Sequence, residues 1–217
     1  MSHAIAIDGP AASGKSTVAR EVARRLSLTM VNSGAMYRAI AWAAQQRGVD
    51  TGDKAAVLSM LDSLEVSCGV ADGQSTIAID GVDPGEALRS GEVNAAVSTI
   101  AAIPEVRELL VSLQRSLLKH GDLVMEGRDI GSVVFPETPF KFYIDASEEV
   151  RMKRRAAEGL ADAVRQRDQQ DSQRKASPLV IADGACVVDS SELEIEEVVE
   201  KVLAGLRERG WFDREDP

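Results

Sequence analysis

The chain has 217 residues, 44% of them hydrophobic and 28% charged, and carries a formal net charge of −10. This size and hydrophobic content are typical of one sizeable domain with inserts, and the acidic balance disfavours general binding to nucleic acid or an anionic membrane. Two distant cysteines without a CxxC pattern indicate a reducing compartment. No apolar run is long enough to span a membrane, and no signal peptide is visible. We therefore expect a cytoplasmic protein, and we expect it to be a monomer.

The first element of interest is a glycine-rich loop near the start of the chain. Residues 9–16 read Gly-Pro-Ala-Ala-Ser-Gly-Lys-Ser and fit the phosphate-binding P-loop, G-x-x-x-x-G-K-[ST]. A strand-length apolar run, 3–8, precedes the loop, and apolar residues at helical spacing follow it from 17 to 26. This order provides backbone N–H groups for a phosphate, a lysine for the outer phosphates and a serine hydroxyl for Mg²⁺.

The alternative is a Gly-Pro turn with a surface lysine, but the strand–loop–helix order favours a nucleoside triphosphate site. The residues predicted to bind the triphosphate are Gly9, Pro10, Ala11, Ala12, Ser13, Gly14, Lys15, Ser16 and Thr17. Ser16 is the predicted protein ligand of the Mg²⁺ cofactor.

Beyond the loop, short apolar runs alternate with segments of helical periodicity. The expected strands are 3–8, 28–31, 123–125, 140–144 and 186–188. The expected helices are 17–26, 35–47, a helix through 64 that Asp53 caps, 92–101, 104–119, 148–158 and 195–209. Strands that alternate with helices predict an α/β fold with a parallel sheet. Between 65 and 91 the alternation breaks, because 65–70 and 75–80 flank a four-residue loop, 71–74, and predict an antiparallel hairpin as an insert.

Basic residues gather between Arg151 and Lys175. The eight basic and four acidic residues of this stretch give +4, which leaves −14 for the remainder of the chain. A solvated helix face with pairs such as Arg167 and Asp171 is one interpretation. In a chain with a P-loop, a second interpretation is that arginines neutralise a transferred phosphoryl group, to which their planar fork of donors is suited.

Three further motifs carry a resemblance. They are Asn-Ser-Gly-Ala-Met-Tyr-Arg at 32–38, Glu-Gly-Arg-Asp-Ile-Gly at 126–131, and Arg-Asp-Gln-Gln-Asp-Ser-Gln-Arg at 167–174 ahead of Ser177-Pro178-Leu179. Together with the P-loop, in this order and over nearly the whole chain, they resemble the bacterial cytidylate kinases, nucleoside monophosphate kinases that phosphorylate CMP and dCMP from ATP. The resemblance implies a single P-loop kinase domain with a five-stranded parallel sheet flanked by helices. It also implies a monophosphate-binding insert at about 33–94, with a small antiparallel sheet, and a short lid at about 153–168.

The resemblance also implies roles for individual residues. The implied catalytic residues are Lys15, Arg38, Arg128 and Arg174, of which the three arginines surround the CMP phosphate. The residues implied to read cytosine are Ser33, Arg107 and Asp129, those implied to hold the sugar are Ser98, Arg167 and Asp171, and Tyr37 lines the same pocket. A carboxylate acceptor at Asp129 suits cytosine because its amino group donates, whereas uracil has a carbonyl there. Taken alone, each arginine could be a surface residue and Asp129 a helix cap.

Two departures from the family pattern stand out. Only residues 156–166 separate Arg155 from Arg167, a shorter lid than in many relatives, and Asn32 stands where many relatives have Asp. Arg151, Arg154 and Arg155 lie where the lid begins, and Arg154 is our candidate to bind ATP when the lid closes.

Alternative functions remain open on these residues. The nearest is a P-loop kinase for another nucleoside monophosphate or a small acceptor such as a sugar acid. A GTPase-like switch protein would need an N-K-x-D motif, which the chain does not have. A nucleic-acid-binding module would use the basic stretch 151–175.

Overall fold

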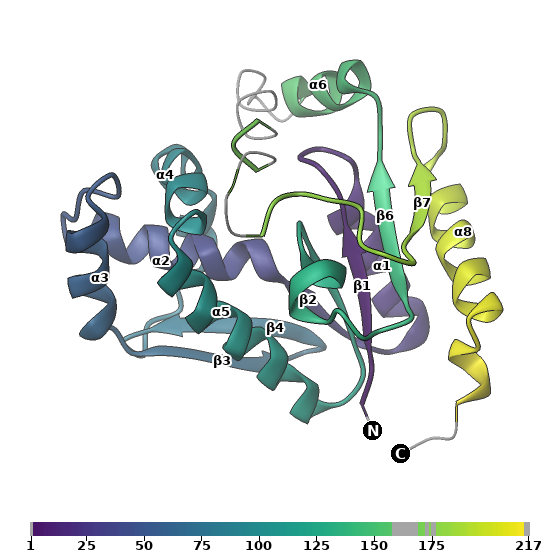
Figure 1. Ribbon diagram of the computed structural model, residues 1–217, viewed down its shortest axis with the longest axis horizontal. Coiled ribbons are helices and arrows are strands. Elements are labelled where there is room, and N and C mark those ends of the chain that lie inside the picture. Colours follow the sequence, from purple (N-terminus) through teal and green to yellow (C-terminus); the bar gives the residue numbers. More distant parts are fainter. Residues whose placement is uncertain (1, 158–168, 172–173, 175–176, 215–217) are drawn as a thin grey trace. The chain divides into compact units, whose positions relative to one another are not determined.

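The computed structural model describes residues 2–157, 169–171, 174 and 177–214 (Figure 1). The chain divides into two compact units, one formed by Met1–Val31 with Gly121–Pro217 and the other by Asn32–His120. The predicted insert, about 33–94, lies within the second of these ranges. Most of the predicted lid, from 158 to 168, lies outside the described residues.

The first unit is built on a sheet with the strand order β2-β5-β1-β6-β7. The strands are β1 (Ala4–Asp8), β2 (Thr29–Asn32), β5 (Leu123–Gly127), β6 (Lys141–Asp145) and β7 (Cys186–Asp189). β1 pairs in parallel with β5 and β6, and β6 pairs in parallel with β7, so these four strands end at the same edge (Figure 1). Every residue of β1 and β5 is buried, as expected for central strands of a parallel sheet. The predicted α/β fold is confirmed.

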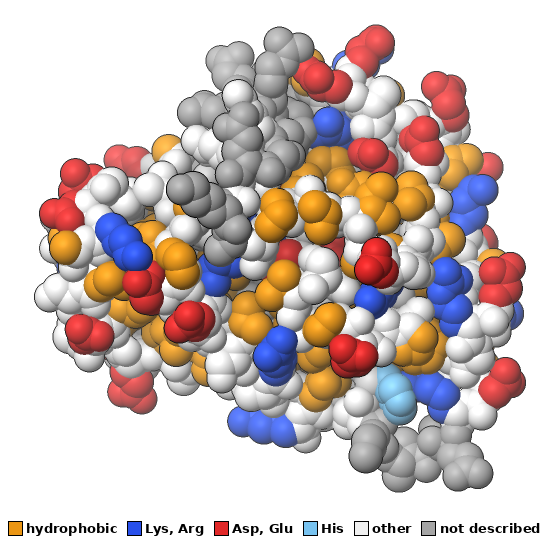
Figure 2. Space-filling view, in the orientation of Figure 1, with side chains coloured by type: hydrophobic (Ala, Val, Ile, Leu, Met, Phe, Trp, Pro, Cys, Tyr) orange, Lys and Arg blue, Asp and Glu red, His pale blue; other side chains and the backbone are white. Residues whose placement is uncertain are grey.

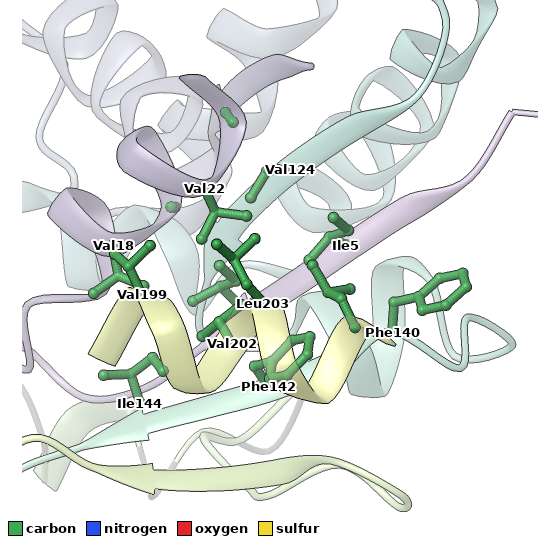
Figure 3. Close-up of a cluster of buried hydrophobic side chains, with 14 of the residues drawn as sticks. Ile5, Val18, Val22, Val124, Phe140, Phe142, Ile144, Val199, Val202 and Leu203 are labelled. Atoms are coloured by element: carbon green, nitrogen blue, oxygen red, sulfur yellow. The ribbon is translucent and has the colours of Figure 1, made fainter. Parts of the chain in front are cut away.

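Helices α1 (Lys15–Leu26) and α8 (Ile195–Glu208) pack against the sheet of this unit. Figure 3 shows Val18 and Val22 of α1 meeting Val199 and Leu203 of α8 over the strand side chains. A third helix, α6 (Glu148–Ala157), follows β6. The core of the unit is thus a layer of branched aliphatic side chains between two helices and the sheet.

Two short elements of the first unit have no counterpart among the expected ones. A single π-helical turn, Ile130–Val134, follows β5, and a short 3₁₀ turn, Trp211–Asp213, follows α8. Trp211 is buried and packs edge-to-face on Phe140, with 4.8 Å between the ring centroids. A π-helical turn is typical of functional sites.

The second unit combines four helices with a hairpin. Its elements are α2 (Ser33–Gln46), α3 (Lys54–Asp62), β3 (Val66–Ala71), β4 (Gln74–Ile79), α4 (Gly91–Ala101) and α5 (Pro104–Ser116), with 3₁₀ turns at Gly85–Arg89 and Leu117–His120. β3 and β4 are antiparallel, which confirms the predicted hairpin. The predicted four-residue loop is wrong, because Ala71 pairs with Gln74. Asp72 and Gly73 alone turn the chain, both at positive φ, as a two-residue hairpin turn requires.

Side-chain caps begin three helices of this unit, α2, α3 and α4, and at α4 the Ser90 hydroxyl accepts a hydrogen bond from the Val93 N–H at 3.3 Å. The Asn32 Oδ1 accepts a hydrogen bond from the Ala35 N–H at 3.0 Å, at the start of α2. The Asp53 carboxylate accepts from the N–H groups of Ala55 and Ala56, as the sequence predicts for α3. An uncharged amide oxygen at position 32 therefore provides the cap that an aspartate would provide.

Surface charge in the first unit is organised around α1 and α8. Arg25 of α1 pairs with Glu21 at 2.9 Å, with Glu200 at 2.6 Å and with Glu196 at 2.5 Å, the last two on α8. Side chains of both signs follow the edge that α8 forms (Figure 2). Within the residues that the structure describes, no helix has the length and apolar character needed to cross a membrane.

Candidate active site

The P-loop joins β1 to α1 and has the backbone shape of an anion site. Gly9 adopts a φ of +154°, and a Cβ there would lie 2.1 Å from the Ile144 carbonyl oxygen, so the position requires glycine. Ala12 and Gly14 both adopt left-handed conformations, with φ of 60° and 87°. Left-handed residues in such a turn make consecutive N–H groups converge, which is how backbone concavities bind phosphate. Ala12 holds this conformation without being glycine, the kind of local strain found at functional sites.

Lys15 is the buried cation of this loop. Its side chain is only 5% exposed, and its ammonium donates to the Pro10 carbonyl oxygen at 3.0 Å. The pKa of Lys15 is lowered to about 7, first by burial and then by the charge of Arg128, while the carboxylates of Glu126, Asp171 and Asp8 act to raise it. These four charged groups, from three separate chain segments, therefore lie close enough to Lys15 to act on its charge.

The turn after β5 is held by Asp8, the last residue of β1. One carboxylate oxygen of Asp8 accepts from the Ile130 N–H at 2.8 Å, and the other accepts from the Gly131 N–H at 2.7 Å. Burial raises the pKa of Asp8 to about 7, the two N–H groups oppose that shift, and the charge of Asp129 adds to it. Asp129 occupies the N-cap position of the turn without a side-chain cap bond. The helix-cap interpretation of Asp129 is thus wrong, because Asp8 performs that role.

Asp171 joins two of the predicted phosphate-binding arginines. Arg128 donates through Nε to one Asp171 oxygen at 2.9 Å, and Arg174 donates to the other oxygen. Asp171 is buried, and the Arg128 side chain is 23% exposed. One buried carboxylate therefore orients both guanidinium groups. Arg167, the other predicted sugar-binding residue of this motif, lies outside the described residues.

The remaining predicted acceptor residues belong to the second unit. The Arg107 guanidinium lies over the Tyr37 ring, 5.3 Å from its centroid, and donates to the Ala101 carbonyl oxygen at 3.0 Å. Arg38 donates to the Asn94 side chain at 3.3 Å. Within the unit, cation–π stacking and a backbone bond thus hold Arg107 in one orientation. Ser33 and Ser98 are buried on α2 and α4.

Two arginines of α6 contact the P-loop backbone. Arg151 donates to the Ala11 carbonyl oxygen and Arg154 donates to the Ser13 carbonyl oxygen, each at 3.3 Å. Arg154 also donates to Ser190, which follows β7. The contact of Arg154 with ATP stays a prediction.

Sequence reasoning did not single out Asp8, Glu126, Asn94 or Ser190. For the first two a signal was present, because β1 and β5 are apolar runs that end on a carboxylate next to a glycine. Parallel pairing aligns Ile7 with Glu126 and Asp8 with Gly127, which brings both carboxylates to one edge. In P-loop proteins an acidic residue at the end of a neighbouring strand acts on the metal and the phosphates. Asn94 and Ser190 had no such signal.

The P-loop between β1 and α1, with Lys15 buried near the charges of Arg128, Glu126, Asp171 and Asp8, is the phosphate site of a P-loop protein. A solved sugar kinase from Janibacter sp. HTCC2649 has a similar fold, with a TM-score of 0.53 and 15% identity over 95% of each chain. A sequence model of the cytidylate kinase family matches residues 5–208. The cytidylate kinase of Geobacillus sp. (strain WCH70) is 42% identical over 94% of this chain and 96% of its own length. That of Pseudomonas aeruginosa (strain LESB58) is 40% identical over 95% and 96%. The chain belongs to the cytidylate kinase family.

Proposed function

We propose that this protein transfers the γ-phosphoryl group of ATP to CMP or dCMP, which yields ADP and CDP or dCDP. Family membership supports this reaction. The observation that carries it is the closeness of two motifs within the first unit. The charges of Arg128 and Asp171, which belong to the predicted acceptor site, shift the pKa of Lys15 in the P-loop. A group that holds the donor phosphates and groups suited to the acceptor phosphate thus lie together.

On the donor side, the P-loop N–H groups and Lys15 bind the outer phosphates. The oxygen donors next to the loop suit Mg²⁺, since the Ser16 hydroxyl is partly exposed at the start of α1 and the Glu126 and Asp8 carboxylates act on Lys15. Mg²⁺, held by Ser16 and the phosphates, supplies further neutralisation of phosphate charge when bound. Arg154 is kept as a candidate ATP-binding residue of the lid.

On the acceptor side, an oxygen of the CMP phosphate attacks the γ-phosphorus in line. A P–O bond forms to CMP while the bond to the β-phosphate oxygen breaks, and ADP leaves with that electron pair. The attacking oxygen is already anionic, so positioning and charge neutralisation carry the catalysis. Arg38, Arg128 and Arg174 provide the neutralisation, and Asp171 orients the last two.

Cytosine is read by Ser33, Arg107 and Asp129, and the sugar is held by Ser98, Arg167 and Asp171, with Tyr37 beside them. The Asp129 carboxylate accepts a hydrogen bond from the cytosine amino group. Uracil presents an oxygen at that position, which leaves the carboxylate poorly paired. The capping of the following turn by Asp8 supports this role, because Asp129 is not required as the cap.

An acceptor panel tests the proposal. CMP, dCMP, UMP and AMP are offered with ATP and Mg²⁺, and ADP formation is measured. We expect CMP and dCMP to be the best acceptors, and a clear preference for UMP or AMP would favour the other kinase function instead. Asp129→Ala is expected to lower the CMP-to-UMP ratio of kcat/KM by tenfold or more, roughly the value of one charged hydrogen bond. Asp129→Asn, which keeps a carbonyl acceptor, is the matched variant and should retain more of the ratio; an unchanged ratio in Asp129→Ala refutes the base-reading role.

We also propose that the protein acts as a cytoplasmic monomer on small nucleotides, without a nucleic-acid or membrane partner. The net charge of −10 supports the absence of nucleic-acid and membrane partners, because an acidic protein repels polyanions. Light scattering tests whether the protein is a monomer. A polyanion-binding assay at moderate salt tests whether it binds nucleic acid or an anionic membrane.

A further inference from the structure

The carbonyl groups of the P-loop have donors of their own. The Pro10 oxygen accepts from the Lys15 ammonium at 3.0 Å, and the Ala11 oxygen accepts from Arg151 at 3.3 Å. The Ser13 oxygen accepts from Arg154 at 3.3 Å and from the Ser190 hydroxyl at 3.0 Å. In this loop the N–H groups serve the ligand, so the carbonyls need other partners.

Both arginines come from one face of α6. Their i, i+3 spacing places Arg151 and Arg154 side by side. Arg151 is only 9% exposed and is also fixed by a bond from its Nε to the Ala146 carbonyl oxygen at 2.9 Å. On the same helix Lys153 instead pairs with Glu149, and both of those side chains are more than 70% exposed.

Ser190 links the Arg154 side chain to a third segment. Arg154 donates to the Ser190 hydroxyl at 3.1 Å and to its carbonyl oxygen at 2.8 Å. Ser190 is buried, and its own N–H donates to the Asp145 carbonyl oxygen at 2.8 Å. The Ser13 carbonyl group is therefore held by α6 through Arg154 and by the segment after β7 through Ser190, and Ser190 is itself bonded to the end of β6.

These bonds have a physical consequence for the anion site. A buried carbonyl without a donor is costly, and a bond from a guanidinium is stronger than one from a neutral group. Donors on the carbonyl side fix the peptide planes whose N–H groups must converge on a phosphate. A loop fixed before the ligand arrives binds it more tightly, because less conformational freedom is lost on binding.

We propose that Arg151 and Arg154 are positioning residues that act on ATP through the P-loop backbone. Ser190 binds both the Arg154 side chain and the Ser13 carbonyl oxygen and so holds Arg154 against Ser13. This inference rests on the proposed function only in taking the P-loop as the ATP phosphate site. It differs from the expectation that Arg154 acts by touching ATP.

A double-mutant cycle on Ser190 and Arg154 tests this. If Arg154 acts through the loop, Ser190→Ala and Arg154→Ala each raise KM for ATP by about tenfold, the scale of one lost hydrogen bond. KM for CMP stays the same, and the double variant is no worse than the poorer single one, because both changes release the same peptide. Arg154→Lys, which keeps the charge but cannot bond to Ser13 and Ser190 together, should resemble Arg154→Ala.

Other outcomes overturn the proposal. If Ser190→Ala leaves KM for ATP unchanged while Arg154→Ala raises it, or if the two effects add, Arg154 acts on ATP directly. Lys153→Ala is the matched control on the same helix and should leave both KM values unchanged. Thermal unfolding of each variant identifies the temperature below which all are folded.

Calorimetric titration with ATP in the absence of CMP separates this inference from the proposed function. A protein that binds ATP but does not phosphorylate CMP would refute the proposed reaction, and the cycle could still be measured on ATP affinity. Unchanged ATP affinity in both Ser190→Ala and Arg154→Ala would refute the positioning role whatever the acceptor is.

Discussion

Gly9→Ala perturbs a point where the P-loop lies close to the backbone of a neighbouring strand. The added Cβ would lie 2.1 Å from the Ile144 carbonyl oxygen, whereas ordinary contacts begin at 3.4 Å. Neither atom belongs to a flexible side chain, since Ile144 is on β6, which is paired with both β1 and β7. Relief therefore requires a backbone movement of about 1 Å, by the P-loop or by the strand.

The size of the effect follows from two contributions. Overpacking against an unyielding neighbour costs about 1–3 kcal/mol. The φ of +154° lies in a region that alanine seldom adopts, which adds about 1–3 kcal/mol. Together they amount to about 2–6 kcal/mol, which at about 2–4 °C per kcal/mol for a chain of this size corresponds to a fall in melting temperature on the order of 10 °C. A shift of about 1 Å in the phosphate-binding backbone is expected to weaken kcat/KM for ATP by about a hundredfold.

Thermal unfolding and initial-rate kinetics with ATP measure the two effects. Gly205→Ala is the control, since its Cβ would lie 2.8 Å from Cε1 of the buried Phe142 ring, on α8 and outside the P-loop. Overpacking there exceeds the gain of about 1 kcal/mol in helix propensity, so the variant should lose a little stability and keep its KM for ATP. If Gly9→Ala has the same melting temperature and the same kcat/KM for ATP as the unmodified protein, the close approach at Ile144 does not constrain the loop.

Three further predictions concern single groups. Burial raises the pKa of Asp8 from 3.8 to about 7, so the folded state binds a proton there more tightly than the unfolded state. The stability that this proton contributes is fully present below pH 3.8 and is lost as the pH rises through 7. The unfolding free energy relative to Asp8→Asn should therefore fall by about 2–3 kcal/mol between pH 5 and pH 8, and a flat difference contradicts this. Burial raises the pKa of the Cys68 thiol from 9.0 to about 11, so iodoacetamide at pH 8 should alkylate it about a hundredfold more slowly in the folded protein than in urea; equal rates contradict it. Asp171→Asn should lower kcat/KM for CMP by about tenfold or more, because Arg128 and Arg174 lose their shared anion, and unchanged kinetics would remove Asp171 from the site.

Local patterns in the sequence were sufficient for much of the fold. The P-loop, the alternating periodicity and the Asp53 cap depend on residues close together in the chain, and all were predicted. The observed elements end within three residues of the predicted ones. Errors at the ends have local causes too, such as the Asp72-Gly73 turn that extends both hairpin strands.

Long-range contacts could not be predicted in the same way. The π turn after Asp129 has its cap on Asp8, 122 residues from Ile130 along the chain, so nothing near the turn indicates a helix start. Arg154 and Ser190 are likewise joined to Ser13 only by packing in three dimensions, across 141 and 177 residues. The resemblance to the family, which puts Arg151, Arg154 and Arg155 where the lid begins, predicted contact with ATP. Whether a guanidinium meets a phosphate or a carbonyl depends on where the backbone passes.

The register between β1 and β5 explains why the donor and acceptor motifs are found together. Asp8 is aligned with Gly127, so the residues that follow them, Gly9 and Arg128, leave the sheet side by side. With this register Asp8 and Glu126 face opposite sides of the sheet, and a slip of β5 by one residue would turn Glu126 to the face that Asp8 occupies. The bonds from Ile130 and Gly131 to Asp8 then fix the acceptor motif to the strand that carries the P-loop. Any movement of the base of the P-loop is therefore transmitted to Asp129, and a change at Asp8 should disturb recognition of CMP as well as binding of ATP.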